Sequence, residues 1–397
     1  MTHPPAARPL PRFRPALAAV IPLALVAALA IQPAIGGQSA PVAPSLAAAI
    51  EQARALVEAD LAESGTPGIS AAVAVDGRIV WSEGFGFADL ESQAPARAST
   101  LYRIGSVSKP VTAAAVGQLA VAGKLDLDAP VQRYVPSFPQ KERPITTRQV
   151  AGHIAGIRHY DGGESIGEGQ RHYDDVVDAL AIFQDDPLLF APGERYSYSS
   201  YGWNLISAVV QAAAGEDFLE YMQANVFDPL ALTHTHADDP RWIIRERAGF
   251  YSFRSGRIIN APFVDNSYKW AGGGFISSVE DLVRFGSAHL EAGFLPQEAL
   301  DLLFTSQRTV DGEETGYGIG WRVGGFGELF AADDPRRDDD LARLRVRHHG
   351  GSSVGGRAFL LLIPEARMVV ALLINSDRSF GGGRLAGSVA AAFLEER

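Results

Sequence analysis

Strand-like segments lie near both ends of this chain, and a long stretch with few such segments separates them. Residues 69–75 and 79–81 flank Asp76-Gly77, a pair that favours a tight β-hairpin turn. Residues 358–363 and 368–374 are almost entirely apolar, which is typical of strands buried on both faces. Two more strand-like segments precede them, at residues 317–323 and 343–349. We therefore predict a five-stranded antiparallel sheet that is assembled from both ends of the chain.

Helical patterns surround the predicted strands. Residues 45–64 repeat apolar side chains at helical spacing, and residues 106–123 are apolar on nearly every face, as in a buried central helix. Shorter helices are predicted at residues 174–183, 201–214, 279–292 and 385–394. The predicted fold class is therefore α/β of the α+β type, with helices flanking the antiparallel sheet.

The order of these segments also predicts the domain organisation. Residues 41–397 are expected to form one folded domain. Within it, the α/β part comprises about residues 45–124 and 299–397, and a helical insertion occupies about residues 125–298.

Charge and cysteine content exclude several classes of function. The chain has 46 acidic and 35 basic residues, for a net charge of −11, so nucleic acid is not an expected partner. It contains no cysteine, which excludes disulfides, thiol catalysis and thiolate metal sites.

Residues 1–40 are typical of a targeting segment. Arg8, Arg12 and Arg14 precede an apolar stretch at residues 15–31, and small residues follow it. A membrane-spanning helix prefers about 20 apolar residues, and this stretch is shorter. We predict either a cleaved signal peptide or an uncleaved anchor in the inner membrane. Both imply export to the periplasm or another extracytoplasmic space.

The predicted central helix begins with the pattern S-x-x-K, formed by Ser106 and Lys109. Residues three apart on a helix share one face, so their side chains can touch. A serine hydroxyl becomes a nucleophile when a neighbouring base accepts its proton, and a desolvated lysine can be that base. The pattern alone is weak evidence, because Ser106 could equally be an ordinary helix cap.

Two later segments offer further groups for chemistry. Tyr198 lies in a tyrosine-rich segment, and a nearby ammonium such as Lys109 would lower the pKa of a phenol and favour a phenolate base. Tyr196 and Tyr201 are interpreted as core aromatics. The segment H-H-G-G at residues 348–351 follows a predicted strand, where glycines can present free amide groups to an oxyanion.

The order of S-x-x-K at 106–109, a tyrosine motif at 198–200 and H-x-G at 348–350 resembles the superfamily of class C beta-lactamases and D-alanyl-D-alanine peptidases. The likeness is greatest to mitochondrial serine beta-lactamase-like proteins and covers about residues 45–397. Further similar stretches lie at residues 102–109, 122–128, 156–160 and 264–275. The resemblance implies a beta-lactamase/transpeptidase-like fold.

The resemblance also implies a mechanism. Ser106 would be the acylated nucleophile, Lys109 its proton-sharing neighbour, and Tyr198 the general base and later the acid. The protein would then be a serine hydrolase that acts on small-molecule or peptide substrates with peptide, amide or ester bonds. No cofactor and no metal is implied. The backbone N–H groups of Ser106 and Gly351 would form the oxyanion hole.

Two positions depart from the pattern of the superfamily. Ser200 stands where Y-x-N has its asparagine, and His349 replaces a small hydroxyl residue in the strand motif of His348, His349 and Gly350. His349 is bulky and can titrate near neutral pH. We therefore expect activated esters and short peptides to be better substrates than beta-lactams.

Other residues allow competing interpretations. Ser353 lies in a G-x-S-x-G pattern, but no histidine follows it in the order that an α/β-hydrolase requires, so we reject it as the nucleophile. His234 and His236 form only a weak metal-binding pattern. Structural roles are expected for His153 and His159. Fixing of a loop is the favoured role for three polar residues, Asp265, Asn266 and Lys269.

A protein of another class remains as an alternative. The same scaffold could serve as a catalytically weak or inactive binding or assembly protein, since mitochondrial relatives are known to form filaments. The absent asparagine at Ser200 favours this alternative, whereas the presence of Ser106, Lys109 and Tyr198 favours the hydrolase. The resemblance thus also allows a homo-oligomer or filament.

Overall fold

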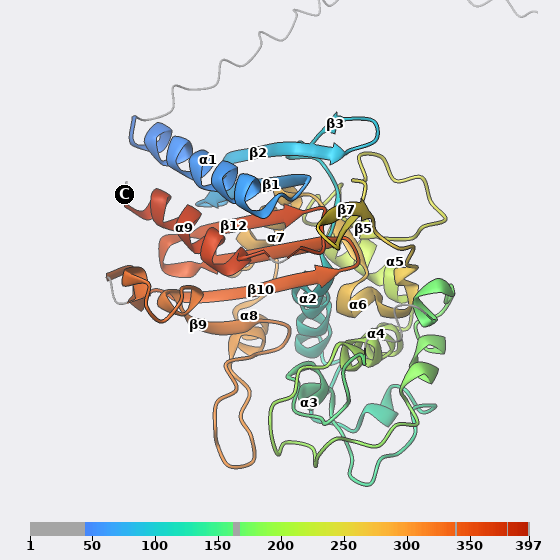
Figure 1. The fold of residues 1–397 in the computed structure, drawn as a ribbon. Coiled ribbons are helices and arrows are strands. Elements are labelled where there is room, and N and C mark those ends of the chain that lie inside the picture. Colours follow the sequence, from blue (N-terminus) through green and yellow to red (C-terminus); the bar gives the residue numbers. More distant parts are fainter. Residues whose placement is uncertain (1–43, 162–166, 338–339, 379, 396–397) are drawn as a thin grey trace, which may run out of the picture. The chain divides into compact units, whose positions relative to one another are not determined.

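An antiparallel sheet of seven strands dominates the part of the chain that the structure describes, in the order β3-β2-β1-β12-β11-β10-β9 (Figure 1). The structure is a computed structural model, and it describes residues 44–161, 167–337, 340–378 and 380–395. The strands are β1 Gly68–Val75, β2 Arg78–Asp89, β3 Ala94–Pro95, β9 Arg322–Gly325, β10 Arg345–Ser353, β11 Gly356–Ile363 and β12 Met368–Ile374. The predicted targeting segment, residues 1–40, lies outside the described residues.

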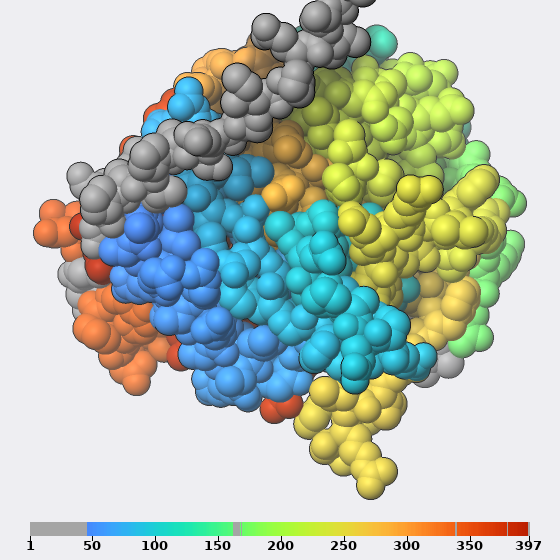
Figure 2. All heavy atoms as spheres, turned by 90° about the horizontal axis from the view of Figure 1, so that it is seen from above, coloured from blue at the N-terminus to red at the C-terminus, as the bar shows by residue number. Residues whose placement is uncertain are grey.

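The two ends of the chain meet in the middle of this sheet, as predicted. Strand β1 pairs with β12 along its whole length, with Ala72 opposite Ala371. The space-filling view also shows N-terminal residues (blue) lying against residues of the C-terminal third (orange and red) (Figure 2). The predicted antiparallel α/β fold is confirmed by this pairing.

The sheet has seven strands rather than the five that we predicted, because all six strand-like segments of the sequence join it and the short edge strand β3 is added. Strand β3 has two residues, and β9 begins at Arg322 instead of Tyr317. Gly320 has a φ angle of 78°, which is outside the β region, so the chain turns there before the strand begins.

Helices cover both faces of the sheet. On one face lie α1, Pro44–Ser64, and α9, Gly382–Leu394, which also contact each other. The other face is covered by α7, Val279–Ser287. In β12, Val370 and Leu372 face α1 and α9, whereas Ala371 faces the opposite core. Both faces of the strand are therefore buried, which explains its continuous apolar sequence.

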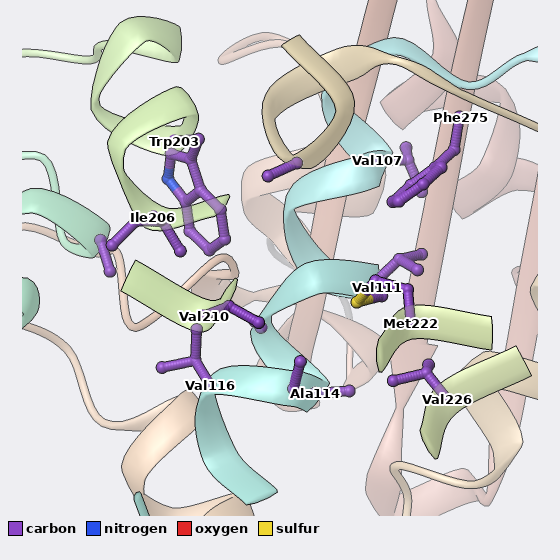
Figure 3. Packing of buried hydrophobic residues seen from close by; sticks show 14 of the residues in the cluster. Val107, Val111, Ala114, Val116, Trp203, Ile206, Val210, Met222, Val226 and Phe275 are labelled. Atoms are coloured by element: carbon purple, nitrogen blue, oxygen red, sulfur yellow. The ribbon is translucent and has the colours of Figure 1, made fainter. Parts of the chain in front are cut away.

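Helix α2, Ser108–Val121, is the buried central helix that the sequence predicted. It packs against α4, Ser200–Ala214, and the close-up shows the apolar residues of the contact (Figure 3). The α-helix begins two residues later than predicted, since Gly105–Val107 form a turn of 3₁₀-helix, η1. Ser106 lies in this turn, and Pro110 lies in the first turn of α2, where its missing N–H costs no hydrogen bond.

The remaining elements lie mainly in the region predicted as a helical insertion. They are α3 Thr147–Ala151, α5 Phe218–Met222, α6 Trp270–Gly273, α8 Gln297–Phe304, β4 Tyr102–Arg103, β5 His236–Ala237, β6 Tyr251–Arg254, β7 Arg257–Asn260 and β8 Phe275–Ser277. Strands β4, β8 and β5 form a small second sheet that the sequence did not predict. The predicted helix at 174–183 is instead a 3₁₀-helix, Asp178–Ile182. The boundaries of the insertion, 125 and 298, stay a prediction.

Among the described residues, no helix combines the length and the apolar character that crossing a membrane requires.

Candidate active site

Ser106 and Lys109 lie at the start of α2, and their side chains meet. Lys109 Nζ is 3.1 Å from Ser106 Oγ, 3.0 Å from Ser200 Oγ and 2.6 Å from the carbonyl oxygen of Gly272. The three neighbours come from η1, α4 and α6, so the S-x-x-K pair is fixed by elements far apart in the sequence. The contact that the i, i+3 spacing predicts is therefore present.

Lys109 is completely buried, and this burial decides its protonation. Desolvation, aided by the positive charge of Lys269, holds the pKa of Lys109 well below its usual value. A neutral amine has two N–H donors and one lone pair. Gly272 O and Ser200 Oγ can accept the two donors, which leaves the lone pair for the hydroxyl proton of Ser106.

Tyr198 lies next to this pair, but not as the phenolate that we expected. Its ring centroid is 4.9 Å from Lys109 Nζ. Burial raises the pKa of Tyr198 to about 12, although the hydroxyls of Ser106 and Ser200 oppose the shift. The expected lowering of this pKa is therefore wrong, because desolvation of the buried phenol outweighs the hydrogen bonds and charges that oppose it. Tyr198 is a neutral phenol that can relay a proton between Ser106 and Ser200.

Two histidines hold the backbone beside Tyr198. The Nδ1 atom of His153 accepts a hydrogen bond from Ser199 N at 3.1 Å, and Nδ1 of His159 accepts one from Ser200 N at 3.1 Å. Burial lowers the pKa of His153 well below its usual value, so its ring remains a neutral acceptor. The geometry agrees with the structural role predicted for His153, while His159 also lines the candidate cleft.

Residues 348–351 lie inside β10 rather than after a strand, which corrects the sequence prediction. His349 is buried, with Nε2 3.0 Å from the hydroxyl of Tyr317 and Nδ1 2.6 Å from Gly350 O. Desolvation by burial lowers the pKa of His349 well below its usual value. The expectation that His349 titrates near neutrality is therefore wrong. Burial also lowers the pKa of His348, to about 4.

Strand β10 touches the turn that carries Ser106, and glycines make this possible. A Cβ atom at Gly351 would lie 1.9 Å from the carbonyl oxygen of Ile104. On the opposite side, Gly105 has a φ angle of 50°, and a Cβ there would lie 2.5 Å from Ser352 N. The backbone of Gly351 is thus beside η1, as an oxyanion hole made with Ser106 would require. That role stays a prediction.

The substitution Gly351→Ala is expected to slow acylation strongly. The added methyl group would push β10 away from Ile104, and loss of one oxyanion donor typically costs a factor of about 10²–10³ in rate. The rate of covalent labelling by a fluorophosphonate probe measures the effect. Gly350→Ala is the matched control, since its Cβ would meet nothing closer than the Phe359 ring at 3.5 Å. Equal labelling of both variants would contradict the expectation.

These residues line an open cleft of about 560 Å³. Its lining includes all eight predicted site residues except Lys109, which lies beneath Ser106. Arg322 and Arg357 also line it, and among the described lining residues no carboxylate is present. Arg322 and Tyr317, which supports His349, were not found from the sequence because neither lies in a recognisable motif.

The competing sites are not assembled in the same way. Ser353 ends β10 and is followed by a turn into β11, so it does not lie at a strand-to-helix elbow. His234 has its backbone N–H bonded to Asp281, and its Nε2 is 3.7 Å from Glu246. Within the described ranges, no group of three or more His, Cys, Asp or Glu side chains could hold a metal ion.

The polar segment before the glycines of α6 divides into two kinds of residue. Asp265 caps the 3₁₀-helix η6, Asn266–Lys269, and accepts a hydrogen bond from Ser267 N at 2.9 Å. Asn266 Nδ2 donates to Asp238 at 2.8 Å. Asp265 and Asn266 thus fix the loop, as expected. The loop-fixing role of Lys269 stays a prediction, and its positive charge also acts on Lys109.

Comparison with known proteins agrees with this geometry. The beta-lactamase family model matches residues 53–393. The chain is 31% identical to the mitochondrial serine beta-lactamase-like protein LACTB of Homo sapiens, over 90% of this chain and 82% of that protein. It is also 31% identical to esterase EstB of Burkholderia gladioli, over 80% of this chain and 88% of that one.

A solved structure, the octameric penicillin-binding protein homologue from Pyrococcus abyssi, has the same fold. Its TM-score is 0.72 at 24% identity, over 87% of this chain and 77% of that chain. The resemblance inferred from the three sequence motifs is confirmed, and the chain belongs to the beta-lactamase family.

Proposed function

We propose that this protein is a serine hydrolase that forms an acyl-enzyme on Ser106, with peptide, amide or ester substrates. The observation that carries the proposal is the position of Lys109 Nζ, 3.1 Å from Ser106 Oγ in a buried pocket. Burial keeps this amine neutral, so it can accept a proton. The relative named as an esterase supports the assignment to the hydrolases.

Acylation then proceeds by balanced proton and bond changes. The Ser106 hydroxyl proton moves to the neutral amine of Lys109 as Oγ bonds to the substrate carbonyl carbon. The carbonyl oxygen becomes an oxyanion, which the N–H groups of Ser106 and Gly351 stabilise. The leaving alcohol or amine takes a proton through Tyr198, and Lys109 resupplies that proton. Water reverses the sequence and releases the acid.

Ester substrates fit this cleft better than beta-lactams. Ser200 replaces an amide side chain, and its hydroxyl is already bonded to Lys109, so it is not free to orient a substrate amide. His349 is held by Tyr317 and Gly350 in the place of a small hydroxyl residue. An activated ester needs only the nucleophile, its base and the oxyanion donors.

We therefore expect kcat/KM for p-nitrophenyl butyrate to exceed that for nitrocefin. Both substrates are coloured on cleavage, so the purified protein can be assayed with each in the same buffer. Lys124→Ala, a substitution of an exposed residue outside the cleft, is the control for effects of protein preparation on both rates. A clear advantage for nitrocefin would refute the substrate preference, and no turnover of either substrate would count against the hydrolase itself.

An assembly protein without turnover is the second candidate function. The fold neighbour from Pyrococcus abyssi is named as octameric, which favours the formation of a homo-oligomer or filament on this scaffold. Against absence of catalysis stands the complete set of contacts around Lys109. We propose that any assembly coexists with hydrolysis, and that residues 1–40 direct export or attach the protein to the inner membrane.

A further inference from the structure

Lys269 is a buried lysine that the acylation steps above do not use. It is 7% exposed and ends η6, directly before α6. Its Cδ lies 3.8 Å from the position of a Cβ on Gly273, and the same position is 3.6 Å from the carbonyl carbon of Gly105. The side chain of Lys269 therefore lies beside Gly273 of α6, next to Gly272, whose carbonyl oxygen accepts a hydrogen bond from Lys109 Nζ.

The ammonium of Lys269 lies among aromatic rings. Its Nζ is 5.2 Å from the ring centroid of Tyr268 and 5.9 Å from that of Tyr160, which lines the cleft. The carboxylate whose charge favours the ammonium of Lys269 is Asp238, and its Oδ2 is already bound by Arg103 Nε at 2.6 Å. Arg103 therefore offsets part of the charge of Asp238, and the positive charge of Lys269 acts on Lys109.

We infer that Lys269 is a positioning residue whose buried positive charge keeps Lys109 in the neutral form that accepts the Ser106 proton. This inference rests on the proposed function. It assigns the tuning charge to η6, which is separate from η1, where Ser106 lies, and from the segment before α4 that carries Tyr198.

The other groups around Lys109 do not supply such a charge. His153 and His349 face it, and burial lowers the pKa of each well below its usual value, so both rings are neutral. Tyr198 is a neutral phenol. The hydroxyl of Ser200 and the carbonyl of Gly272 accept hydrogen bonds from Lys109 and favour its charged form. Burial and the charge of Lys269 are therefore what disfavour the charged form of Lys109.

The sign of the effect follows from these charges. Burial, with the charge of Arg103, lowers the pKa of Lys269 to about 8, so Lys269 is still positive at neutral pH. Removing this charge raises the pKa of Lys109, and a more basic Lys109 stays protonated to higher pH. The acidic limb of the acylation profile therefore moves to higher pH.

The test compares Lys269→Met, which keeps the aliphatic chain, with Lys269→Arg, which keeps the charge. The rate constant of fluorophosphonate labelling at Ser106 is measured against pH, and folding is checked by thermal melting. In Lys269→Met we expect the acidic limb to rise by about one pH unit, which is about a tenfold loss of rate below the limb and little loss above it. Lys269→Arg should retain the wild-type limb.

Each result has one meaning. A limb that stays in place in a folded Lys269→Met variant, or an equal loss of rate at every pH, overturns the inference and leaves the acyl-enzyme intact. If Lys269→Met does not fold, Lys269→Gln takes its place, and the same shift relative to Lys269→Arg is required. If wild-type Ser106 is not labelled at any pH, the proposed function itself fails.

Discussion

The Ser106→Ala variant is expected to lose covalent labelling and turnover completely while it keeps its fold. Ser106 Oγ lies 3.1 Å from Lys109 Nζ, lines the open cleft, and belongs to the turn that packs against Gly351 of β10. Its removal takes away the atom that forms the acyl bond. The N-cap of η1 is Ile104 rather than Ser106, so loss of the hydroxyl should change the melting temperature by only a few degrees.

Intact-mass spectrometry after incubation with a fluorophosphonate checks this result. The wild-type protein should gain the mass of one phosphonyl group, and peptide mapping should place it on Ser106. Ser353→Ala is the control, because Ser353 lies in the competing G-x-S-x-G pattern and should be labelled as the wild type is. Labelling at Ser353 in the Ser106→Ala variant would contradict the assignment of Ser106 as the nucleophile.

The Tyr198→Phe variant is expected to lose most of its turnover, by a factor of about 10²–10⁴, because a group that transfers a proton typically contributes this much. Its ring would still pack against His153 at a centroid distance of 4.3 Å, so the loss would be of the hydroxyl alone. The raised pKa of Tyr198 makes it a relay rather than a phenolate base. Steady-state kcat with p-nitrophenyl butyrate measures the effect.

Two neighbouring tyrosines give matched controls. Tyr201 stacks on Phe183 at 4.9 Å in the core, and Tyr196 packs edge-to-face against His153. Phenylalanine at either position keeps these ring contacts, so Tyr196→Phe and Tyr201→Phe should lose little turnover. If Tyr198→Phe also kept nearly full activity, Lys109 would be the sole base and the relay would be disproved.

Local sequence patterns predicted the parts of the site that depend on local geometry. Ser106 and Lys109 are three residues apart, and the first turns of η1 and α2 bring them to 3.1 Å. The continuous apolar pattern of residues 368–374 predicted a strand buried on both faces, because such a strand must exclude polar side chains from either core. The glycines at 350 and 351 marked the place where β10 approaches the active site.

Protonation could not be predicted in the same way. The sequence analysis expected a lowered pKa for Tyr198 and a titrating His349, and both expectations were wrong. The first was argued from the neighbouring Lys109 and the second from the ordinary pKa of histidine, but the dominant cause of both shifts is desolvation, which depends on how many segments cover the group. His349, for example, is enclosed by Tyr317 and by its own strand, and no local pattern specifies that enclosure.

The sequence by itself determined the sheet from both chain ends, the central helix and the meeting of Ser106 with Lys109. These features follow from apolar periodicity and from spacings of a few residues, which short-range geometry converts directly into structure. Only the tertiary structure decided that Gly272 and Ser200 surround Lys109 and that the charge of Lys269 acts on it. The physical reason is that desolvation and Coulomb interactions depend on distance in space, and the folded chain brings these residues together across long separations in sequence.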